Sequence, residues 1–196
     1  MDESAQRLRS HVQVIVSLIN LHAQYIDSVN VKDFVNKLKM RIELIATTLP
    51  MALALSPERK ALVETLDAVA AIVAEIYDPQ DLHSCALTVD DVDIPAAALA
   101  PICQLFAEFV SNIYARAKPG ESERVAARLF AVPQGRIALS VSAKGVAPRA
   151  QPEPLDLLTS RIIQELARSV GGEASFDRGA IRDASLIFPM PAGGAH

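Results

Sequence analysis

Residues 6–26, QRLRSHVQVIVSLINLHAQYI, constrain the fold more than any other stretch of the chain. Apolar residues here form two neighbouring helical stripes, each stepping by three or four residues. The first stripe contains Leu8, Val12, Ile15, Ile19 and Ile26, with His22 filling the place between the last two. The second contains Val14, Leu18, Leu21 and Tyr25. One stripe is typical of a surface helix, whereas two adjacent stripes need more than one helical neighbour. We therefore predict that this helix lies in a four-helix bundle.

The following segment predicts the partner of this helix. After a short turn at residues 28–30, a second helical stripe contains Val35, Leu38, Ile42, Ile45 and Leu49. Short turns join antiparallel helices, so the two segments predict a helical hairpin. A single hairpin cannot bury stripes this wide, and we expect a homodimer in which two hairpins form the bundle. Pro50 predicts a kink in the second helix. Ser56-Pro57 predicts the start of a third helix, whose apolar residues recur at helical spacing: Leu62, Leu66, Val69, Ile72 and Ile76.

The composition changes after residue 78, where strand patterns begin to alternate with helical ones. We expect strands at 85–89, 125–132, 136–143, 173–176 and 184–188, and helices at 97–117 and 155–170. The turn Pro133-Gln134-Gly135 joins two of the strands as a hairpin, and Gly171-Gly172 ends the last helix. The predicted fold class is therefore α+β, with helices on one face of a mostly antiparallel sheet. Residues 1–78 form the predicted helical domain and residues 79–196 the α+β domain.

Composition excludes several classes of protein. A formal net charge of -4 argues against a broad basic face for nucleic acid. No apolar run approaches the roughly 20 residues of a membrane span, and the first ten residues lack the apolar core of a signal peptide. Cys85 and Cys103 are far apart and lack nearby metal-ligating residues, so we expect free thiols and no metal site. These features predict a cytoplasmic protein without membrane or nucleic-acid partners.

The order of elements resembles the core of a two-component sensor histidine kinase. Such a core joins a dimerisation and phosphotransfer bundle to an ATP-binding domain of the gyrase/Hsp90/kinase type. Residues 12–21 are similar to the later part of the family motif HRVKNNLQVISSLLNLQ, and Arg41-Ile42 stands where the family has an Arg-Ile pair. Glu108 and Asn112 resemble the N-box, whose acid and amide help to hold the magnesium of the nucleotide in the family. Residues 166–172 are similar to the last helix of the ATP-binding domain.

The chain departs from the family at its chemical positions. Gln6 stands where the family has its phospho-accepting histidine, and an amide has no nucleophilic ring nitrogen. In the family's Asp-x-Gly-x-Gly box, Ala143 replaces the adenine-binding aspartate, Gly145 is kept, and Ala147 replaces the second glycine. The following glycine-rich box falls on residues 157–160, which contain no glycine, so side chains would crowd the phosphates. The chain thus resembles a degenerate kinase, similar in plan to dimeric kinase-derived histidine phosphotransferases, and we expect no bound ATP or magnesium.

The resemblance implies a non-catalytic two-component protein that docks the receiver domain of a response regulator. The expected docking residues are Gln6, Arg7, Ser10 and His11 near the open end of the bundle. Two other functions are compatible with the sequence: an active histidine phosphotransferase that uses His11, and a nucleotide-binding kinase with an unusual pocket. A structural interpretation also stands, in which His11 lines the bundle and Glu108 with Asn112 is a relic or a helix-surface pair.

Overall fold

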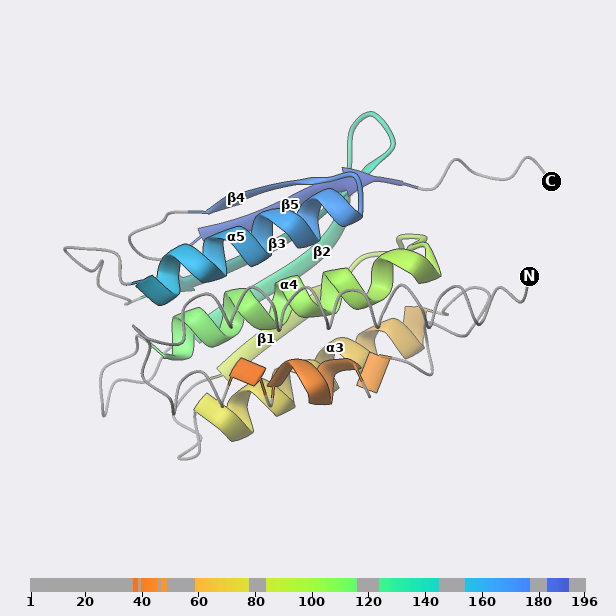
Figure 1. Cartoon of the computed structure of the whole chain (residues 1–196). Coiled ribbons are helices and arrows are strands. Elements are labelled where there is room, and N and C mark those ends of the chain that lie inside the picture. The colour runs from red at the N-terminus through yellow and green to blue at the C-terminus, as the bar shows by residue number, and fades with distance from the viewer. Residues whose placement is uncertain are drawn as a thin grey trace, which may run out of the picture.

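The computed structural model describes residues 37–38, 40–45, 47–48, 59–77, 84–115, 124–144, 154–176 and 183–190. Residues 37–38, 40–45 and 47–48 are helical. The elements that follow are α3 (Arg59–Tyr77), β1 (Ser84–Val89), α4 (Ala96–Tyr114), β2 (Arg124–Val132), β3 (Arg136–Lys144), α5 (Pro154–Ser169), β4 (Glu173–Phe176) and β5 (Asp183–Pro189), labelled as in Figure 1.

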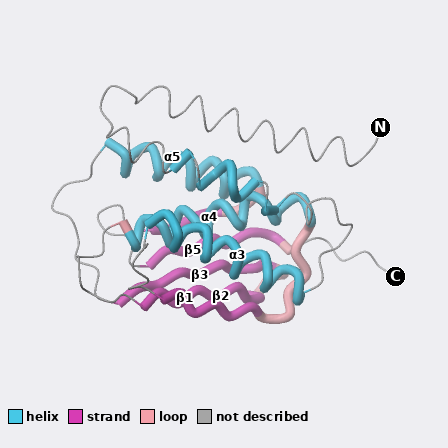
Figure 2. The backbone as a smooth tube through the Cα atoms, turned by 90° about the horizontal axis from the view of Figure 1, so that it is seen from below, coloured by secondary structure: helices cyan, strands magenta, loops and turns pink. Residues whose placement is uncertain are grey.

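The five strands form one sheet in the order β1-β2-β3-β5-β4. β1 runs parallel to β2, and the other three pairs are antiparallel. Helices α3, α4 and α5 cover one face of this sheet, with α4 in the middle (Figures 1 and 2). The predicted combination of helices with a mostly antiparallel sheet is confirmed. The first helix of the predicted hairpin lies outside the described residues, and the bundle and the homodimer stay predictions.

The turn between β2 and β3 follows the sequence closely. Gln134 and Gly135 have φ values of 68° and 64°, a left-handed conformation that glycine adopts without steric cost. The strands on either side pair in register, with Leu129 opposite Leu139. Side chains at alternate positions of β2 are buried, as period-two patterning requires. The predicted hairpin is therefore confirmed.

The end of α5 is set by two glycines. The Gly171 N–H donates to the Arg168 carbonyl at 2.9 Å, and the Gly172 N–H donates to the Ala167 carbonyl at 2.9 Å. This bonding pattern and the φ of 66° at Gly171 are those of a Schellman motif, which satisfies the last carbonyls of a helix. The helix therefore ends where the Gly-Gly pair predicts.

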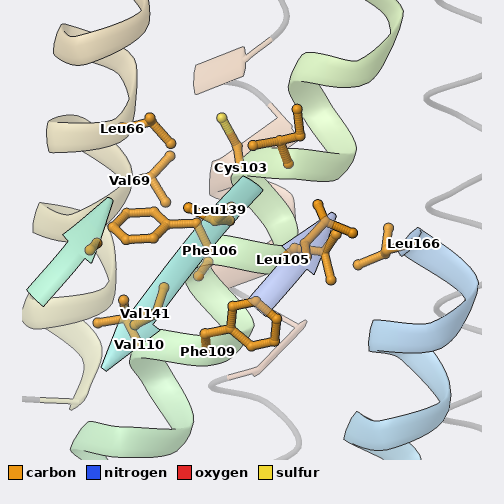
Figure 3. Close-up of a cluster of buried hydrophobic side chains, with 14 of the residues drawn as sticks. Leu66, Val69, Cys103, Leu105, Phe106, Phe109, Val110, Leu139, Val141 and Leu166 are labelled. Carbon is orange, nitrogen blue, oxygen red and sulfur yellow. The ribbon is translucent and has the colours of Figure 1, made fainter. Parts of the chain in front are cut away.

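Helix α4 is the centre of the hydrophobic core. Ala96 and every residue from 98 to 114 are buried. The large side chains of Leu105, Phe106 and Phe109 are fully buried. Figure 3 shows its apolar side chains among those of α3, α5 and the sheet. Among the described helices, only α4 is long and apolar enough to cross a membrane, and nearly all of its residues are buried inside the fold. A helix that is apolar around most of its circumference belongs in such a core.

The same core includes residues from both sides of the predicted boundary at residue 78. Leu62, Leu66 and Val69 of α3 are buried in it, as the helical spacing predicts. Met40 and Leu44 of the preceding helical segment are also fully buried members of this cluster. The division of the chain into domains 1–78 and 79–196 stays a prediction, and α3 packs directly on α4 and β1.

Both cysteines are free thiols, as predicted. Cys103 is buried in the core, and burial raises the pKa of its thiol to about 12. Cys85 is half-buried in β1, and desolvation, with a smaller contribution from the charge of Asp67, raises its pKa to about 11. Neither thiol is therefore ionised enough at neutral pH to act as a nucleophile.

Candidate functional site

Helix α4 places Glu108, Ser111 and Asn112 on one side because residues three and four apart share a helical face. The Asn112 amide Nδ2 donates to the backbone carbonyl of Glu108 at 2.6 Å. The Ser111 hydroxyl donates to the same carbonyl at 3.3 Å. The structure therefore brings the two predicted N-box residues together, but it directs the Asn112 amide to its own helix.

A second helical segment supplies the partners of the Glu108 carboxylate. Arg41 donates to Glu108 Oε1 through Nε at 2.8 Å and through Nη2 at 2.5 Å. Lys37 Nζ lies 3.4 Å from Glu108 Oε2 and donates to Ser111 Oγ at 2.7 Å. We call Lys37, Arg41, Glu108, Ser111 and Asn112 the Glu108 cluster. All five residues are buried, and Glu108 itself is 1% exposed.

The electrostatics of the Glu108 cluster keep its carboxylate ionised. Burial alone would raise the pKa of Glu108, but the charges of Arg41 and Lys37 and the hydrogen bonds they donate outweigh burial and lower it. The Lys37 ammonium also lies 5.4 Å from the centroid of the Tyr77 ring, within the range of a cation–π contact. The carboxylate is therefore a charged acceptor whose two oxygens both face side-chain cations.

This arrangement limits what the Glu108 cluster can do chemically. A divalent metal needs carboxylate oxygens that are open to it, whereas Arg41 contacts Oε1 and Lys37 faces Oε2. Within the described ranges, no group of three or more His, Cys, Asp and Glu side chains could hold a metal ion. In this conformation, the cluster is suited to joining two helices, and a metal could reach Glu108 only by displacing the two cations.

The other positions of the expected nucleotide site lie in regular structure. Ala143 is half-buried in β3, opposite Val125 of β2. Residues 157–160, where the resemblance places a glycine-rich box, belong to α5. Leu158 is 1% exposed and Thr159 is 3% exposed, so their side chains pack inward. Gly145 lies outside the described residues.

The predicted docking residues Gln6, Arg7, Ser10 and His11 also lie outside the residues that the structure describes. The docking surface therefore stays a prediction.

Lys37 and Ser111 were not predicted as site residues, and Arg41 was named only for the Arg-Ile pair of the family resemblance, without its contact to Glu108. The predicted apolar stripe of the second helix is not the face that packs on α4, because Ile42 is 53% exposed and Leu38 and Ile45 are only half-buried. The buried face contains Lys37, Met40, Arg41, Leu44 and Thr48. These residues also recur at helical spacing, so the sequence contained a pattern from which this buried face could have been predicted. A search for apolar residues alone does not find the pattern, because two of the five side chains are charged.

Comparison with known proteins gives likeness in structure only. No family model matches the chain, and no curated protein sequence matches it. The histidine kinase domain of a blue-light activated histidine kinase from Erythrobacter litoralis superposes with a TM-score of 0.64 at 20% identity, covering 97% of this chain and 95% of that one. The chain has the fold of histidine kinase domains.

Two further solved structures share this fold. A longer structure of the blue-light activated histidine kinase from Erythrobacter litoralis has a TM-score of 0.67 at 17% identity, covering 98% of this chain and 65% of that one. The Acinetobacter baumannii histidine kinase AdeS has a TM-score of 0.50 at 13% identity, covering 94% of this chain and 97% of that one. At these identities the likeness concerns the fold, and the chemistry of this chain depends on its own residues.

Proposed function

We propose that this protein is a non-catalytic, histidine kinase-like component of two-component signalling, which docks the receiver domain of a response regulator. The observation that carries the proposal is that the Glu108 carboxylate is already ion-paired inside the protein. This carboxylate stands at the N-box position that the family resemblance assigns to magnesium, and Arg41 and Lys37 neutralise it. A charge already paired inside the protein offers a magnesium nucleotide little electrostatic attraction.

Two other features support the loss of nucleotide chemistry. Ala143 has no carboxylate to accept a hydrogen bond from the adenine amino group. Residues 157–160 are helical and carry side chains, whereas phosphate recognition needs a loop in which the backbone can approach the ligand. Each feature removes a different part of a nucleotide site, namely the metal ligand, the base contact and the phosphate contact.

The proposed assembly is a cytoplasmic homodimer that binds its partner through the first helical segment. Gln6 replaces the phospho-acceptor of the family, so docking there would not lead to a phosphorylated protein. Arg7 supplies a cation for an acidic receiver surface, and Ser10 and His11 follow on the next turn. In this proposal the protein binds a receiver and leaves its phosphoryl group in place.

Calorimetric titration with Mg-ATP tests the non-catalytic part of the proposal. We expect no heat of binding up to millimolar nucleotide. The variant Ala143→Asp restores the missing carboxylate and is a matched control. It should also bind no ATP, because the Glu108 cluster and residues 157–160 are unchanged. A dissociation constant in the low micromolar range for the wild-type protein would instead support a nucleotide-binding kinase with an unusual pocket.

A further inference from the structure

Residues 37–48 meet α4 through two kinds of contact on one helical face. Met40 and Leu44 join the apolar core, and Lys37 and Arg41 reach Glu108. The ion pairs join residues 71 and 67 positions apart in the sequence. Apolar burial is non-directional, whereas a charge-assisted hydrogen bond fixes the relative positions of donor and acceptor. The charged residues therefore add geometric information that the apolar residues do not supply.

We propose that Lys37, Arg41 and Glu108 form an interhelical clamp, a conformational device that fixes the register of residues 37–48 on α4. Arg41 binds one carboxylate oxygen through two N–H groups. One helical turn away, Lys37 lies between the other oxygen and the Ser111 hydroxyl. A shift by one residue rotates a helical side chain by about 100°, which would remove both contacts. The clamp therefore permits one register.

Burial makes the three charges depend on one another. The side chains of Lys37 and Arg41 are each 4% exposed, and that of Glu108 is 1% exposed. Loss of Glu108 removes the acceptor that the two cations share, and a buried charge without its partner is strongly unfavourable. By contrast, the pair Arg128–Asp90 has side chains 57% and 38% exposed, so water screens it. This exposed pair provides a matched control.

The clamp makes residues 37–48 and α4 move as one body. A force or a partner acting on this helical segment is then transmitted to the centre of the core, because α4 contacts α3, α5 and β3. The clamp goes beyond the proposed function and does not depend on it, since it holds whether or not the protein docks a receiver domain.

Hydrogen–deuterium exchange of the full-length protein at neutral pH tests the clamp. In Glu108→Gln, we expect amide exchange in the peptide spanning residues 37–48 to accelerate by at least about 10-fold, because this segment opens locally. Peptides from β2 and β3 should accelerate less than residues 37–48, because core strands exchange only when the whole fold opens. The double variant Glu108→Gln/Arg41→Met should exchange no faster than Glu108→Gln alone, because one substitution already opens the clamp. The control Asp90→Asn should leave residues 37–48 unchanged.

Three results would overturn the clamp. The first is an unchanged rate in residues 37–48 of Glu108→Gln. The second is an equal acceleration in β2 and β3, which would indicate general destabilisation. The third is an additive effect in the double variant, which would mean that the two residues act independently. If Glu108→Gln fails to fold, Arg41→Lys replaces it, because this variant keeps the charge but loses the paired N–H contact. It should accelerate the same segment selectively, and a wild-type rate would overturn the proposal.

Discussion

At the scale of single residues, Glu108 is a fully buried acid in the middle of a mostly apolar helix. It is tolerated there because Arg41 and Lys37 reach it from another helix and stay buried with it. A buried charge without a partner is strongly destabilising, whereas attraction to a buried partner offsets the cost of removing the charge from water. The two cations therefore decide whether this carboxylate stabilises the fold.

The pH dependence of stability follows from the lowered pKa of Glu108. A lowered pKa in the folded state means that the stabilisation is complete above the unfolded value of about 4.3 and is lost as pH falls through the folded value. At neutral pH, Glu108→Gln should lower the free energy of unfolding by about 3–5 kcal/mol. This difference should shrink below about pH 4.3, where the unfolded wild-type chain takes up a proton. Urea unfolding of both proteins across this range measures it.

The exposed pair Arg128–Asp90 supplies the control for this measurement. Asp90→Asn should change the free energy of unfolding at neutral pH by less than about 1 kcal/mol, because water screens the pair. A difference between wild type and Glu108→Gln that stays constant or widens as pH falls would contradict the argument.

At the scale of elements, the sequence was informative wherever the pattern is local. The sequence predicted β2 and β5, in which burial alternates along the strand, and the Gly-Gly pair predicted the end of α5. Helix α4 ends at Tyr114, three residues before the predicted position, with Ala115 in a turn. The apolar stripe of residues 35–49 was predicted to face the helical bundle, which stays a prediction. The face that packs on α4 was not predicted, because it buries a lysine and an arginine. Their acceptor, Glu108, lies about seventy residues further along the chain, so the spacing of residues within one helix cannot predict that contact.

The turn after α5 gives a prediction at the scale of elements. A Cβ atom at Gly172 would lie 2.6 Å from the Ile187 carbonyl oxygen and 2.8 Å from the Phe188 Cβ atom. Gly172→Ala should therefore push α5 away from β5 and destabilise the protein by roughly 1–3 kcal/mol. Gly135→Ala is the comparison, because nothing lies within 4 Å of its Cβ position and only its φ of +64° is unfavourable. Thermal unfolding should show a larger loss at Gly172, and the reverse order would contradict the packing argument.

At the scale of the whole molecule, one core unites the sheet with four helical segments. Helix α4 contacts α3 on one side and α5 on the other, and residues 37–48 are joined to it by the Glu108 cluster. The fold class could be predicted from the order of strands and helices. The candidate site could be predicted only in part. Glu108 and Asn112 were found through the family resemblance, while the contacts that Lys37, Arg41 and Ser111 make in the cluster depend on how the two helices pack.

The proposed homodimer gives a prediction about assembly. Ile15 lies in the first apolar stripe, which we expect to be buried between helices of the bundle. Ile15→Asp would place an unpaired charge there and cost several kcal/mol, so the dimer should dissociate. Light scattering should give a dimer mass for the wild-type protein and a monomer mass or aggregation for the variant. A stable wild-type monomer at micromolar concentration would contradict the proposed assembly.

Incubation with a radiolabelled phospho-receiver domain tests the central claim most directly. We expect the protein to bind the receiver and to remain unlabelled, because Gln6 has no nucleophilic nitrogen and His11 stands five residues further along the predicted helix. Arg7→Glu should weaken this binding, whereas Arg161→Glu, a charge reversal at an exposed position of α5, should leave it unchanged. Label that appears on the wild-type protein and disappears in His11→Ala would contradict the account, and would identify the protein as an active histidine phosphotransferase.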